Sequence, residues 1–566
     1  MPVANIPAAK RAGLPVDLDR LTAEGDDWLS PEQRYALKTH GVCAQSQPQV
    51  FMVRVRNGGD LTAGQACGLA DIAERHGRGW LHLTTRQQAE LHHVHATEVN
   101  AVLAAVRALG LTTRSTCGHT VRGVMWCPDA GVALAEPFDC APDAHAITAA
   151  VLARTPDLDT QLPSRVNIHL GGCPACRDHA RLNDAGLVSV LGAGGQPGYE
   201  LWVGGSLGRS VPTLAVKALD FVPRAHAVTA VTALLDVYIA HGNFDQPNKA
   251  RMKFLLRDLG ADRFLDLFRA AYARTCRRPH PPPPQVEVSD ADLAAAVLAQ
   301  APEGGWSRGV RPQRTPGRAV VTVEIPLGDL DADDLRGLAG LAGRYADGVL
   351  HLTRDQDITL RHVPLGAVPA LRGDLGDLGL AVAGTTAARD VRACTGGPVC
   401  SLAITASQQV AWAVRSSPAL ARNGHLRVSV SGCPNACAQQ QVADVGFSGG
   451  KVHVGGGAQL GYQVWLGGDI AAGRVGQVVG RVAERDVPAI TEAIVGLWEA
   501  LRAAGESLPQ TVTRLGPDAF AAHIDRVFRG RWESGAEPGQ RPRAAGDTPT
   551  AGLTLEPDRL LPLAVA

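Results

Sequence analysis

The sequence lacks any long apolar run, since no stretch approaches the ~18 consecutive apolar residues that favour a membrane-spanning helix. Residues 1–20 are interrupted by prolines and lack the apolar segment of a secretory signal, so we expect a cytoplasmic protein without a membrane span. Charge of one sign is also lacking, because 55 Lys and Arg residues balance 55 Asp and Glu residues. A net charge of zero gives no general attraction to nucleic acid or to an anionic membrane.

Lysine is scarce, with six residues against 49 arginines. Arginine offers a planar guanidinium that binds oxyanions through two parallel hydrogen bonds. Genomic base composition is the alternative explanation, and only the positions of the arginines can separate the two. Hydrophobic residues make up 45% of the 566 residues and charged residues 19%, which indicates a globular protein of three or four domains.

Twelve cysteines in a chain of this length do not indicate a disulfide framework, and their grouping favours a reducing compartment. Four form two local pairs, Cys394 with Cys400 and Cys433 with Cys437, separated by five and three residues within each pair. Soft thiolates of this kind suit zinc or an iron–sulfur cluster. Structural zinc favours gaps of two or four residues. The glycines and proline in the first gap suit a loop around something larger than one ion, and four buried structural cysteines are the alternative.

A duplication is the main architectural feature of the sequence. Residues 69–87 align without a gap on residues 338–356, at an offset of 269. A second repeat places Gly172-Cys173-Pro174 on Gly432-Cys433-Pro434. The first repeat predicts a strand at 51–56, a helix at 61–76 and a strand at 80–85. We expect the two copies to pack about a pseudo-twofold axis, where ligands commonly bind.

The second copy of the cysteine motif differs from the first. Cys437 aligns with Arg177 and Cys176 aligns with Ala436, so the first copy cannot supply the same ligands. Cys173-Pro-Ala-Cys176 could by itself be a redox or zinc pair. No second pair stands at zinc spacing, and we interpret the pair as a relic of the duplication.

Other candidate motifs predict no further cofactor. His92, His93 and His95 on a strand beside Glu90 indicate a polar face more than a metal site. The glycine-rich stretches 192–195 and 455–457 do not open a helix after a strand with an acidic residue about 20 positions on, so they are predicted to be hairpin turns. The sequence therefore predicts no nicotinamide- or flavin-binding domain.

The contexts Cys-Thr-Gly-x-x-x-Cys and Gly-Cys-Pro-Asn-x-Cys resemble those of the sirohaem-dependent nitrite and sulfite reductases. The resemblance extends from about residue 41 to about residue 505, and residues 441–446 are most similar to the ferredoxin–nitrite reductase branch. It implies that Cys394, Cys400, Cys433 and Cys437 hold a 4Fe–4S cluster and that Cys437 also bridges to the sirohaem iron. It also implies an α+β fold with duplicated ferredoxin-like half-domains and two α/β sirohaem- and cluster-binding domains.

The expected domains follow from the repeats and from composition. They are an N-terminal extension at 1–45, paired ferredoxin-like half-domains at 46–115 and 316–385, a first nitrite/sulfite reductase domain at 116–278, a linker at 279–315, a 4Fe–4S/sirohaem domain at 386–525 and a disordered tail at 526–566. Four consecutive prolines at 281–284 favour a stiff, extended linker. The Gly-, Pro- and Arg-rich composition after Arg529 favours disorder.

Arginines stand where an anionic ligand would need them. Arg54 and Arg56 alternate along a strand, and Arg165 and Asn167 alternate at the approach to another, so each pair shares a face. The resemblance implies that the substrate side of the sirohaem is lined by Arg54, Arg122, Arg165 and Asn167. It also implies sirohaem contacts from Thr84, Arg86, Gln356, Asn435 and Cys437. The chain departs from the family at Arg165, where lysine is usual, and at Ser164, where an arginine commonly meets a sirohaem carboxylate.

The resemblance implies six-electron reduction of nitrite to ammonia, with electrons from a ferredoxin-type donor and a monomeric enzyme. Asparagine at position 167 resembles the nitrite reductases, where sulfite reductases carry lysine. Alternatives are an assimilatory sulfite reductase and, on the same scaffold, a precorrin-3B synthase-like monooxygenase of cobalamin synthesis. A non-catalytic electron carrier or a zinc-stabilised scaffold is the alternative from a different class.

Overall fold

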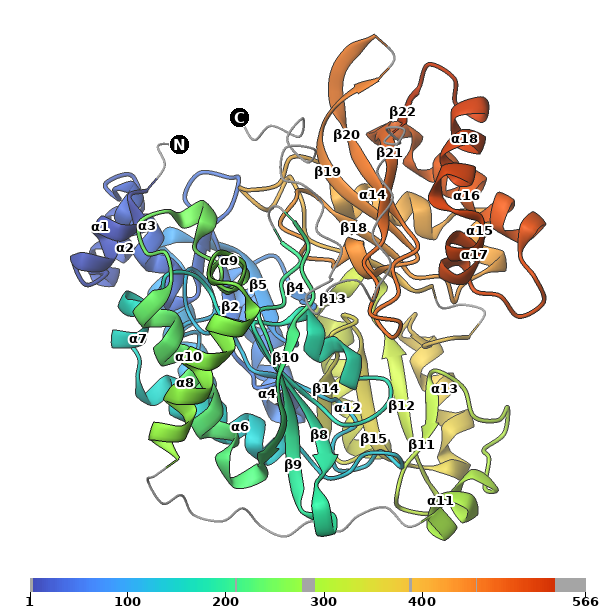
Figure 1. The fold of residues 1–566 in the computed structure, drawn as a ribbon, viewed down its shortest axis with the longest axis horizontal. Helices are drawn as coiled ribbons and strands as arrows, with labels where there is room; N and C mark the ends of the chain where they lie inside the picture. The colour runs from blue at the N-terminus through green and yellow to red at the C-terminus, as the bar shows by residue number, and fades with distance from the viewer. Residues whose placement is uncertain (1–3, 209–210, 277–290, 386–388, 455, 535–566) are drawn as a thin grey trace. The chain divides into compact units, whose positions relative to one another are not determined.

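The structure, a computed structural model, describes residues 4–208, 211–276, 291–385, 389–454 and 456–534 (Figure 1). The chain divides into two compact units. Unit 1 comprises Met1–Ser206, Leu214–Val323 and Asp329–Leu380, and unit 2 comprises Leu207–Thr213, Glu324–Gly328 and Ala381–Ala566. In the described parts of both units, no helix has the length and apolarity needed to cross a membrane.

Two sheets of unit 1 are built from the duplicated sequence (Figure 1). In hydrogen-bonding order, the first contains β1 (Val42–Ala44), β2 (Val50–Val55), β5 (Ala89–His95), β4 (Trp80–Leu83) and β13 (Asp329–Asp331). The second contains β11 (Val310–Pro312), β12 (Arg318–Glu324), β15 (Ile358–Pro364), β14 (Val349–Leu352) and β3 (Asp60–Thr62). The associated helices are α4 (Ala63–His76), α5 (Val99–Ala108), α12 (Ala332–Tyr345) and α13 (Val368–Asp377). The predicted duplication is thus confirmed as two half-domains with the same element order.

Each half-domain donates one strand to the sheet of the other. β3 pairs antiparallel with β14, and β13 pairs antiparallel with β4. The side-chain contacts are reciprocal at the offset of 269 found in the sequence. Gln87 Nε2 donates to Leu352 O at 2.9 Å, and Gln356 Nε2 donates to Leu83 O at 2.9 Å. Such matched contacts confirm the expected pseudo-twofold relation of the half-domains.

The start of α4 differs from the sequence prediction. Leu61 was expected to begin the helix, but it lies in β3, because the three-residue strand pairs with β14 of the other half-domain. The helix begins after Thr62, whose Oγ1 accepts from the Gln65 amide at 3.2 Å while the Gln65 side chain accepts from the Thr62 amide at 3.1 Å. This capping box satisfies two amides that the helix leaves without internal partners. The helix ends at His76, before Gly77, as predicted.

A third sheet in unit 1 carries the first copy of the cysteine motif. Its strands, in hydrogen-bonding order, are β10 (Val216–Pro223), β9 (Pro197–Val203), β8 (Ala185–Leu191), β7 (Ile168–Gly171) and β6 (Met125–Trp126). Its helices are α6 (Ala141–Ala153), α7 (Asp157–Gln161), α8 (Ala227–His241), α9 (Met252–Leu259) and α10 (Ala261–Thr275). β6, β7 and β8 run parallel, whereas β8, β9 and β10 are antiparallel. The 192–195 turn joins β8 to β9 as the predicted hairpin.

Unit 2 repeats this topology around its own sheet. The strands, in order, are β17 (Val391–Ala393), β18 (Val428–Ser431), β19 (Val445–Val454), β20 (Gly457–Leu466), β21 (Gln477–Ala483) and β22 (Trp532–Ser534). The helices are α14 (Ser407–Arg415), α15 (Pro418–Arg422), α16 (Val487–Leu501), α17 (Leu508–Leu515) and α18 (Pro517–Val527). β17, β18 and β19 are parallel, and β19 and β20 form the second predicted hairpin. The apolar faces of sheet and helices meet in one core that contains Phe447, Trp498 and Phe520.

Regular elements occur in the segments that the sequence assigned to an N-terminal extension, a linker and a tail. Residues 1–45 contain α1 (Ile6–Arg11), α2 (Leu18–Glu24) and α3 (Pro31–Leu37). The expected linker at 279–315 contains α11 (Ala291–Leu298) and β11, while its four prolines lie outside the described residues. The tail expected from residue 526 begins within α18, and β22 pairs with β21 and buries Trp532. A single tryptophan in a Gly- and Arg-rich context gave no periodic signal for this edge strand. Residues 535–566 lie outside the described part of the chain.

Candidate functional site

The two cysteine loops of unit 2 lie at the carboxyl ends of adjacent parallel strands. Cys394 directly follows β17, and Cys433 follows β18 by one residue. The pairing of Ala393 with Val430 places these two strand ends side by side, and the Cys394 amide continues the pairing by donating to Val430 O at 3.2 Å. The strand order therefore brings together two motifs that are 32 residues apart in the sequence.

A glycine permits the close approach of the two loops. A Cβ atom at Gly432 would lie 3.2 Å from the Cα atom of Gly396 and 2.9 Å from Thr405 O. The Gly432 amide donates to Cys394 Sγ at 3.2 Å, and Ser407 Oγ lies 3.3 Å from the same sulfur. Hydrogen bonds to a ligating sulfur stabilise its thiolate and tune an iron–sulfur cluster. The first loop is thus arranged to present a sulfur ligand.

The sulfurs of the two loops are not gathered as the ligands of a single ion would be. Sulfurs bound to one tetrahedral zinc lie about 3.8 Å apart, given a Zn–S bond of about 2.3 Å. All four of these cysteines are among the described residues, and no three of their sulfurs come within 4.8 Å of one another. Cys433 is buried, Cys394 and Cys400 are half-buried, and Cys437 is exposed. These four thiols therefore do not form a compact single-ion site, and they remain the predicted ligands of a 4Fe–4S cluster.

Unit 1 carries the predicted arginines. Arg54, the fifth residue of β2, donates from Nε to Glu90 Oε1 of β5 at 2.8 Å and from Nη1 to Thr116 O at 3.2 Å. Burial opposes the charged form, but the neighbouring Cys117 and Glu90 outweigh it and raise the pKa of Arg54. The same arginine lowers the pKa of Glu90 against the effect of burial. Glu90 thus fixes the guanidinium in position.

Arg56 has a structural role that its place on the strand did not reveal. Its guanidinium donates to Ser115 O at 3.0 Å and Val121 O at 2.7 Å, and it also contacts Arg122 O at 3.3 Å. Burial and then the charge of Arg122 lower the pKa of Arg56 to about 10. These contacts tie β2 to the loop that carries Arg122, so Arg56 supports that loop.

Arg122 is buried and Arg86 is half-buried, and each guanidinium keeps one buried donor without a partner among the described residues. Arg122 donates to Gly118 O at 3.0 Å, and Arg86 donates to Gly123 O at 3.4 Å. In both side chains the Nε atom is buried and has no hydrogen-bond partner among the described residues. Burial, then the charges of Arg122, Arg54 and Arg251, lowers the pKa of Arg86 to about 9. Several cations that repel one another in a buried region favour an anionic ligand.

Asn167 and Arg165 lie together on the approach to β7, as predicted. The Asn167 amide donates to Asp184 Oδ2 at 2.8 Å, which fixes the backbone at the start of the strand. Its side-chain Oδ1 is buried without a hydrogen-bond partner in the described structure. The charge of Arg165 contributes, after burial and Lys10, to a pKa of His119 well below its usual range. Both residues therefore belong to the same electropositive region as Arg122.

The remaining predicted cofactor contacts lie in turns. Thr84 follows β4, and its Oγ1 accepts from the amides of Arg86 at 3.3 Å and Gln88 at 3.2 Å, which fixes the turn that carries Arg86. Gln356 lies in the equivalent turn after β14, where it contacts the backbone of Leu83. Asn435 lies half-buried between Cys433 and Cys437 in unit 2.

Arg251 and Lys253 are two further buried cations that no motif in the sequence indicated. Arg251 is buried and contacts Asp184 Oδ2 at 3.0 Å. Burial, then Arg251 and later Arg165, lowers the pKa of Lys253 to about 7, with Asp184 opposing. Both cations stand at the start of α9, where the helix dipole disfavours positive charge. That unfavourable placement was a signal in the sequence that an anion is expected nearby.

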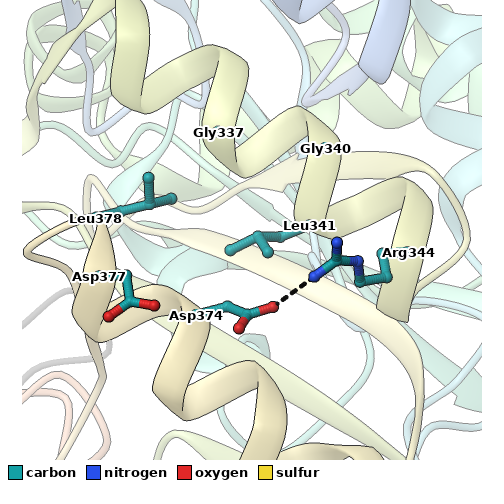
Figure 2. A pocket seen from close by; sticks show the side chains of 7 residues that line it. All are labelled: Gly337, Gly340, Leu341, Arg344, Asp374, Asp377 and Leu378. Atoms are coloured by element: carbon teal, nitrogen blue, oxygen red, sulfur yellow. Dashed lines mark hydrogen bonds and ion pairs between the residues drawn. The ribbon is translucent and has the colours of Figure 1, made fainter.

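Figure 2 shows a hollow between α12 and α13. It is lined by Gly337, Gly340, Leu341, Arg344, Asp374, Asp377 and Leu378. Arg344 Nη1 donates to Asp374 Oδ2 at 2.8 Å across one side. The hollow includes none of the predicted site residues, and the glycines of α12 leave it as a gap in helix packing.

Comparison with known proteins assigns the regions that carry these residues to one family. The family of the nitrite and sulphite reductase 4Fe-4S domain matches residues 117–275 and 384–530, and its ferredoxin-like half domain matches residues 44–109 and 311–378. The ferredoxin–nitrite reductase of Synechococcus elongatus is 31% identical over 435 residues, which cover 75% of this chain and 81% of that protein. The assimilatory ferredoxin-dependent nitrite reductase of Haloferax mediterranei is 28% identical over 553 residues, covering 90% of this chain and 91% of that protein.

A sulfite reductase is also among the relatives. The ferredoxin sulfite reductase of Mycobacterium tuberculosis is 28% identical over 439 residues, covering 75% of this chain and 74% of that protein. The solved structure of the Mycobacterium tuberculosis NirA protein shares the fold, with a TM-score of 0.76 at 24% identity, and covers 92% of this chain and 98% of that one. The paired thiols and the buried cations fit the two cofactors of this family, a 4Fe–4S cluster and an anionic sirohaem. The chain belongs to the sirohaem- and 4Fe–4S-dependent nitrite and sulfite reductase family of oxidoreductases.

Proposed function

We propose that this protein is a ferredoxin-dependent nitrite reductase that carries out the six-electron reduction of nitrite to ammonia. The observation that carries the choice is Asn167, a neutral side chain with an unused buried Oδ1 in a region of buried arginines. Relatives named nitrite reductase support the same choice at 28–31% identity. The 28% identical sulfite reductase keeps sulfite reduction as the second candidate.

The proposed roles of the residues follow from charge and burial. Arg54, Arg122 and Arg165 attract the anion and hold it through charge-assisted hydrogen bonds. Because Glu90 and the carbonyls of residues 116 and 118 hold Arg54 and Arg122, these donors need little reorganisation as charge develops on the substrate. Cys394, Cys400, Cys433 and Cys437 would hold the cluster, with Thr84, Arg86, Gln356 and Asn435 as contacts of the sirohaem. When bound, the two cofactors supply the electron transfer, and the protein supplies binding, orientation and protons.

The proposed electron donor is a ferredoxin. The relatives' names include this donor, and the sequence offers no nucleotide-binding motif, which supports an external carrier as the source of electrons. We propose that the carrier docks by charge complementarity, as acidic donors commonly do.

The substrate choice is tested by adding one charge at Asn167. Nitrite is a monoanion, whereas sulfite is largely divalent above neutral pH. An added cation at about 5 Å favours the dianion by about 3 kcal/mol at an effective dielectric constant of about 20, and by less after screening. The wild type is expected to have the higher kcat/KM for nitrite. Asn167→Lys is expected to shift the nitrite-to-sulfite ratio of kcat/KM toward sulfite by about ten- to a hundredfold.

The measurement is a pair of steady-state assays with one reduced donor on wild type, Asn167→Lys and Gln300→Lys. Gln300 is exposed and adds the same charge away from the predicted site residues, so this control should keep the wild-type ratio. A wild type that prefers sulfite contradicts the proposed function. A lysine variant that loses activity on both substrates equally shows that charge at position 167 does not set the preference.

A further inference from the structure

Three cysteines of unit 1 converge in a place that the family function does not use. Cys127, Cys173 and Cys176 have their sulfurs within 4.8 Å of one another, and all three are buried. Cys127 Sγ lies 3.1 Å from Cys173 Sγ. In the described chain this is the one group of three or more His, Cys, Asp or Glu residues with ligand atoms this close.

Strand register shows how this group relates to the cluster motif. Trp126 pairs with Leu170 in the sheet of unit 1, and Ala393 pairs with Val430 in the sheet of unit 2. Cys127 is the residue after the edge strand β6, as Cys394 is the residue after β17. Cys173 stands three residues after Leu170, as Cys433 stands three residues after Val430. Two cysteines of unit 1 thus occupy the same topological positions as two cluster ligands.

The distances in unit 1 fit one ion. Sulfurs on a single thiophilic ion lie about 3.8–4.0 Å apart for bonds of about 2.3 Å in tetrahedral or trigonal geometry. Three sulfurs within 4.8 Å need only a small adjustment to reach that spacing. The unit 2 thiols do not meet this condition, so the two copies have diverged toward different kinds of ligand.

A cation already stabilises negative charge on this group. Arg354 Nη1 donates to Cys176 Sγ at 3.0 Å, and its Nη2 donates to Ala175 O at 2.5 Å. Arg311 pairs with Asp129 Oδ1 at 2.7 Å. Burial lowers the pKa of Arg311, but Asp129, and after it the negative charges of Cys173 and Cys176, raise it overall. Buried arginines beside thiols favour the thiolate, which is the form that binds metals. Three thiolates on one ion leave excess negative charge that Arg354 offsets.

We propose that Cys127, Cys173 and Cys176 form a binding site for a single thiophilic metal ion that shares no ligand with the 4Fe–4S cluster. Soft thiolates select Cu(I) and Zn(II) among the metals available to a protein in a reducing compartment. Three thiolates complete the coordination of trigonal Cu(I), and they leave one position on Zn(II) for an external ligand. The pair that the sequence analysis interpreted as a relic therefore keeps a ligand function, with Cys127 as the missing partner.

The test uses the full-length protein with its cofactors bound. Wild type, Cys127→Ser, Cys173→Ser, Cys176→Ser and the control Cys67→Ser are each incubated with Zn(II) or with Cu(I) under reducing conditions. They are then freed of loosely held metal with a chelator, and zinc, copper and iron are counted by elemental analysis. Cys67 lies half-buried on α4 and is outside the three-cysteine group, so it matches the substitution without touching the site.

Wild type and Cys67→Ser should keep about one equivalent of zinc or copper per chain. Each of the three site variants should lose it while keeping the iron content and visible spectrum of the wild type. X-ray absorption at the edge of the retained metal, which does not detect iron, should show three sulfur ligands at about 2.3 Å in the wild type. This measurement does not depend on the folding of any variant.

The proposal is overturned by any of three results. These results are that the wild type retains neither ion, that the site variants retain as much metal as the wild type, or that the retained metal has fewer than three sulfur ligands. A Cys127–Cys173 disulfide that persists in the reduced protein, detected as two missing thiols, also overturns it, because a disulfide removes two of the ligands.

Discussion

The charged side chains of the predicted site are held by hydrogen bonds that leave part of their donor capacity free. Arg122 and Arg86 use some of their N–H groups on carbonyls and keep a buried Nε without a partner in the described structure. Buried polar atoms without partners destabilise a protein by about 1–3 kcal/mol each. An oxyanion or a cofactor carboxylate is the kind of acceptor that would satisfy them.

At the same scale, Cys437 and Cys176 are predicted to differ in their effect on the cofactors. Cys437→Ser should abolish most of the cluster iron and weaken the sirohaem bands. The reason is that the family resemblance implies that the Cys437 sulfur would bind both a cluster iron and the sirohaem iron. Cys176→Ser should keep both, because Cys176 lies in the group of unit 1. Iron analysis and the visible spectrum of both purified variants make the comparison. Loss of cluster iron in Cys176→Ser, with Cys437→Ser intact, contradicts the ligand assignment.

At the scale of elements, the two mixed sheets use the same hydrogen bond at the start of one of their parallel strands. In unit 1 the Asp184 carboxylate accepts from the amide of Asn167 at 2.8 Å, and in unit 2 Asp444 accepts from the amide of Arg427 at 2.8 Å. Each aspartate lies just before the next parallel strand, β8 or β19. A carboxylate there satisfies a backbone amide that the sheet leaves open. The duplication has thus kept a bond that fixes the register near each site.

Titration of Asp444 makes the stability contributed by this hydrogen bond dependent on pH. Burial raises the pKa of the carboxyl to about 6, from 3.8 in the unfolded chain. Between these values the folded state binds more protons than the unfolded state, so this group lowers the free energy of unfolding as pH rises from about 4 to 6. The full shift corresponds to about 3 kcal/mol, and because the residue is half-exposed we expect about 1–2 kcal/mol.

Asp444→Asn is predicted to remove that pH dependence while keeping an acceptor for the Arg427 amide. Relative to the wild type, the variant should gain about 1–2 kcal/mol of stability between pH 4.5 and pH 7. The measurement is calorimetric unfolding of both proteins across this range. If the free energies of unfolding of the two proteins change in parallel with pH, the Asp444 carboxyl does not titrate between pH 4.5 and pH 7.

At the scale of the whole molecule, the duplication appears as matched ion pairs between the half-domains. His82 Nδ1 lies 2.6 Å from Asp329 Oδ1, and His351 Nδ1 lies 2.7 Å from Asp60 Oδ1. Burial opposes the charge on each histidine, but Asp329 outweighs it at His82, and Asp347 together with Asp60 outweighs it at His351, so the pKa of both histidines is raised. Each half-domain thus supplies an acid to a histidine of the other.

The raised pKa of the two histidines predicts how the free energy of unfolding changes with pH. The stabilisation is fully present below about pH 6.5, the unfolded value, and is lost as pH rises through the folded pKa. Asp60→Asn and Asp329→Asn should therefore each lower the free energy of unfolding by about 0.5–1 kcal/mol at pH 6 and by less at pH 9, since both carboxylates are partly exposed. Calorimetry on the single and double variants measures this. Equal losses at both pH values, or loss in one variant alone, contradicts matched roles.

The donor prediction also belongs to the whole molecule, because it depends on which domains the chain contains. Turnover with reduced ferredoxin should fall as ionic strength rises, because exposed charges are screened over about 8–10 Å at physiological salt. As a control, turnover with a small, uncharged redox mediator in place of ferredoxin should depend little on salt concentration. Sustained turnover with NADPH alone, without an added carrier, contradicts the prediction.

Much of the site was accessible from sequence because its signals are local. The cysteine spacings, the alternation of Arg54 with apolar neighbours and the glycines that end helices each lie within a few residues. Stereochemistry relates such spacings directly to loops, strands and caps. The duplication was visible for the same reason, since two local patterns recur at a fixed offset and imply two similar half-domains.

Only the tertiary structure decided which distant residues meet. Glu90 fixes Arg54, although 36 residues separate them, because β2 and β5 pair in one sheet. Helix α4 begins later than predicted because Leu61 belongs to β3, which pairs with a strand of the other half-domain. A three-residue strand is too short to show a periodic pattern, so the sequence did not indicate it. Cys127 joins Cys173 because β6 and β7 run parallel in a definite register, and that register depends on packing across the whole sheet.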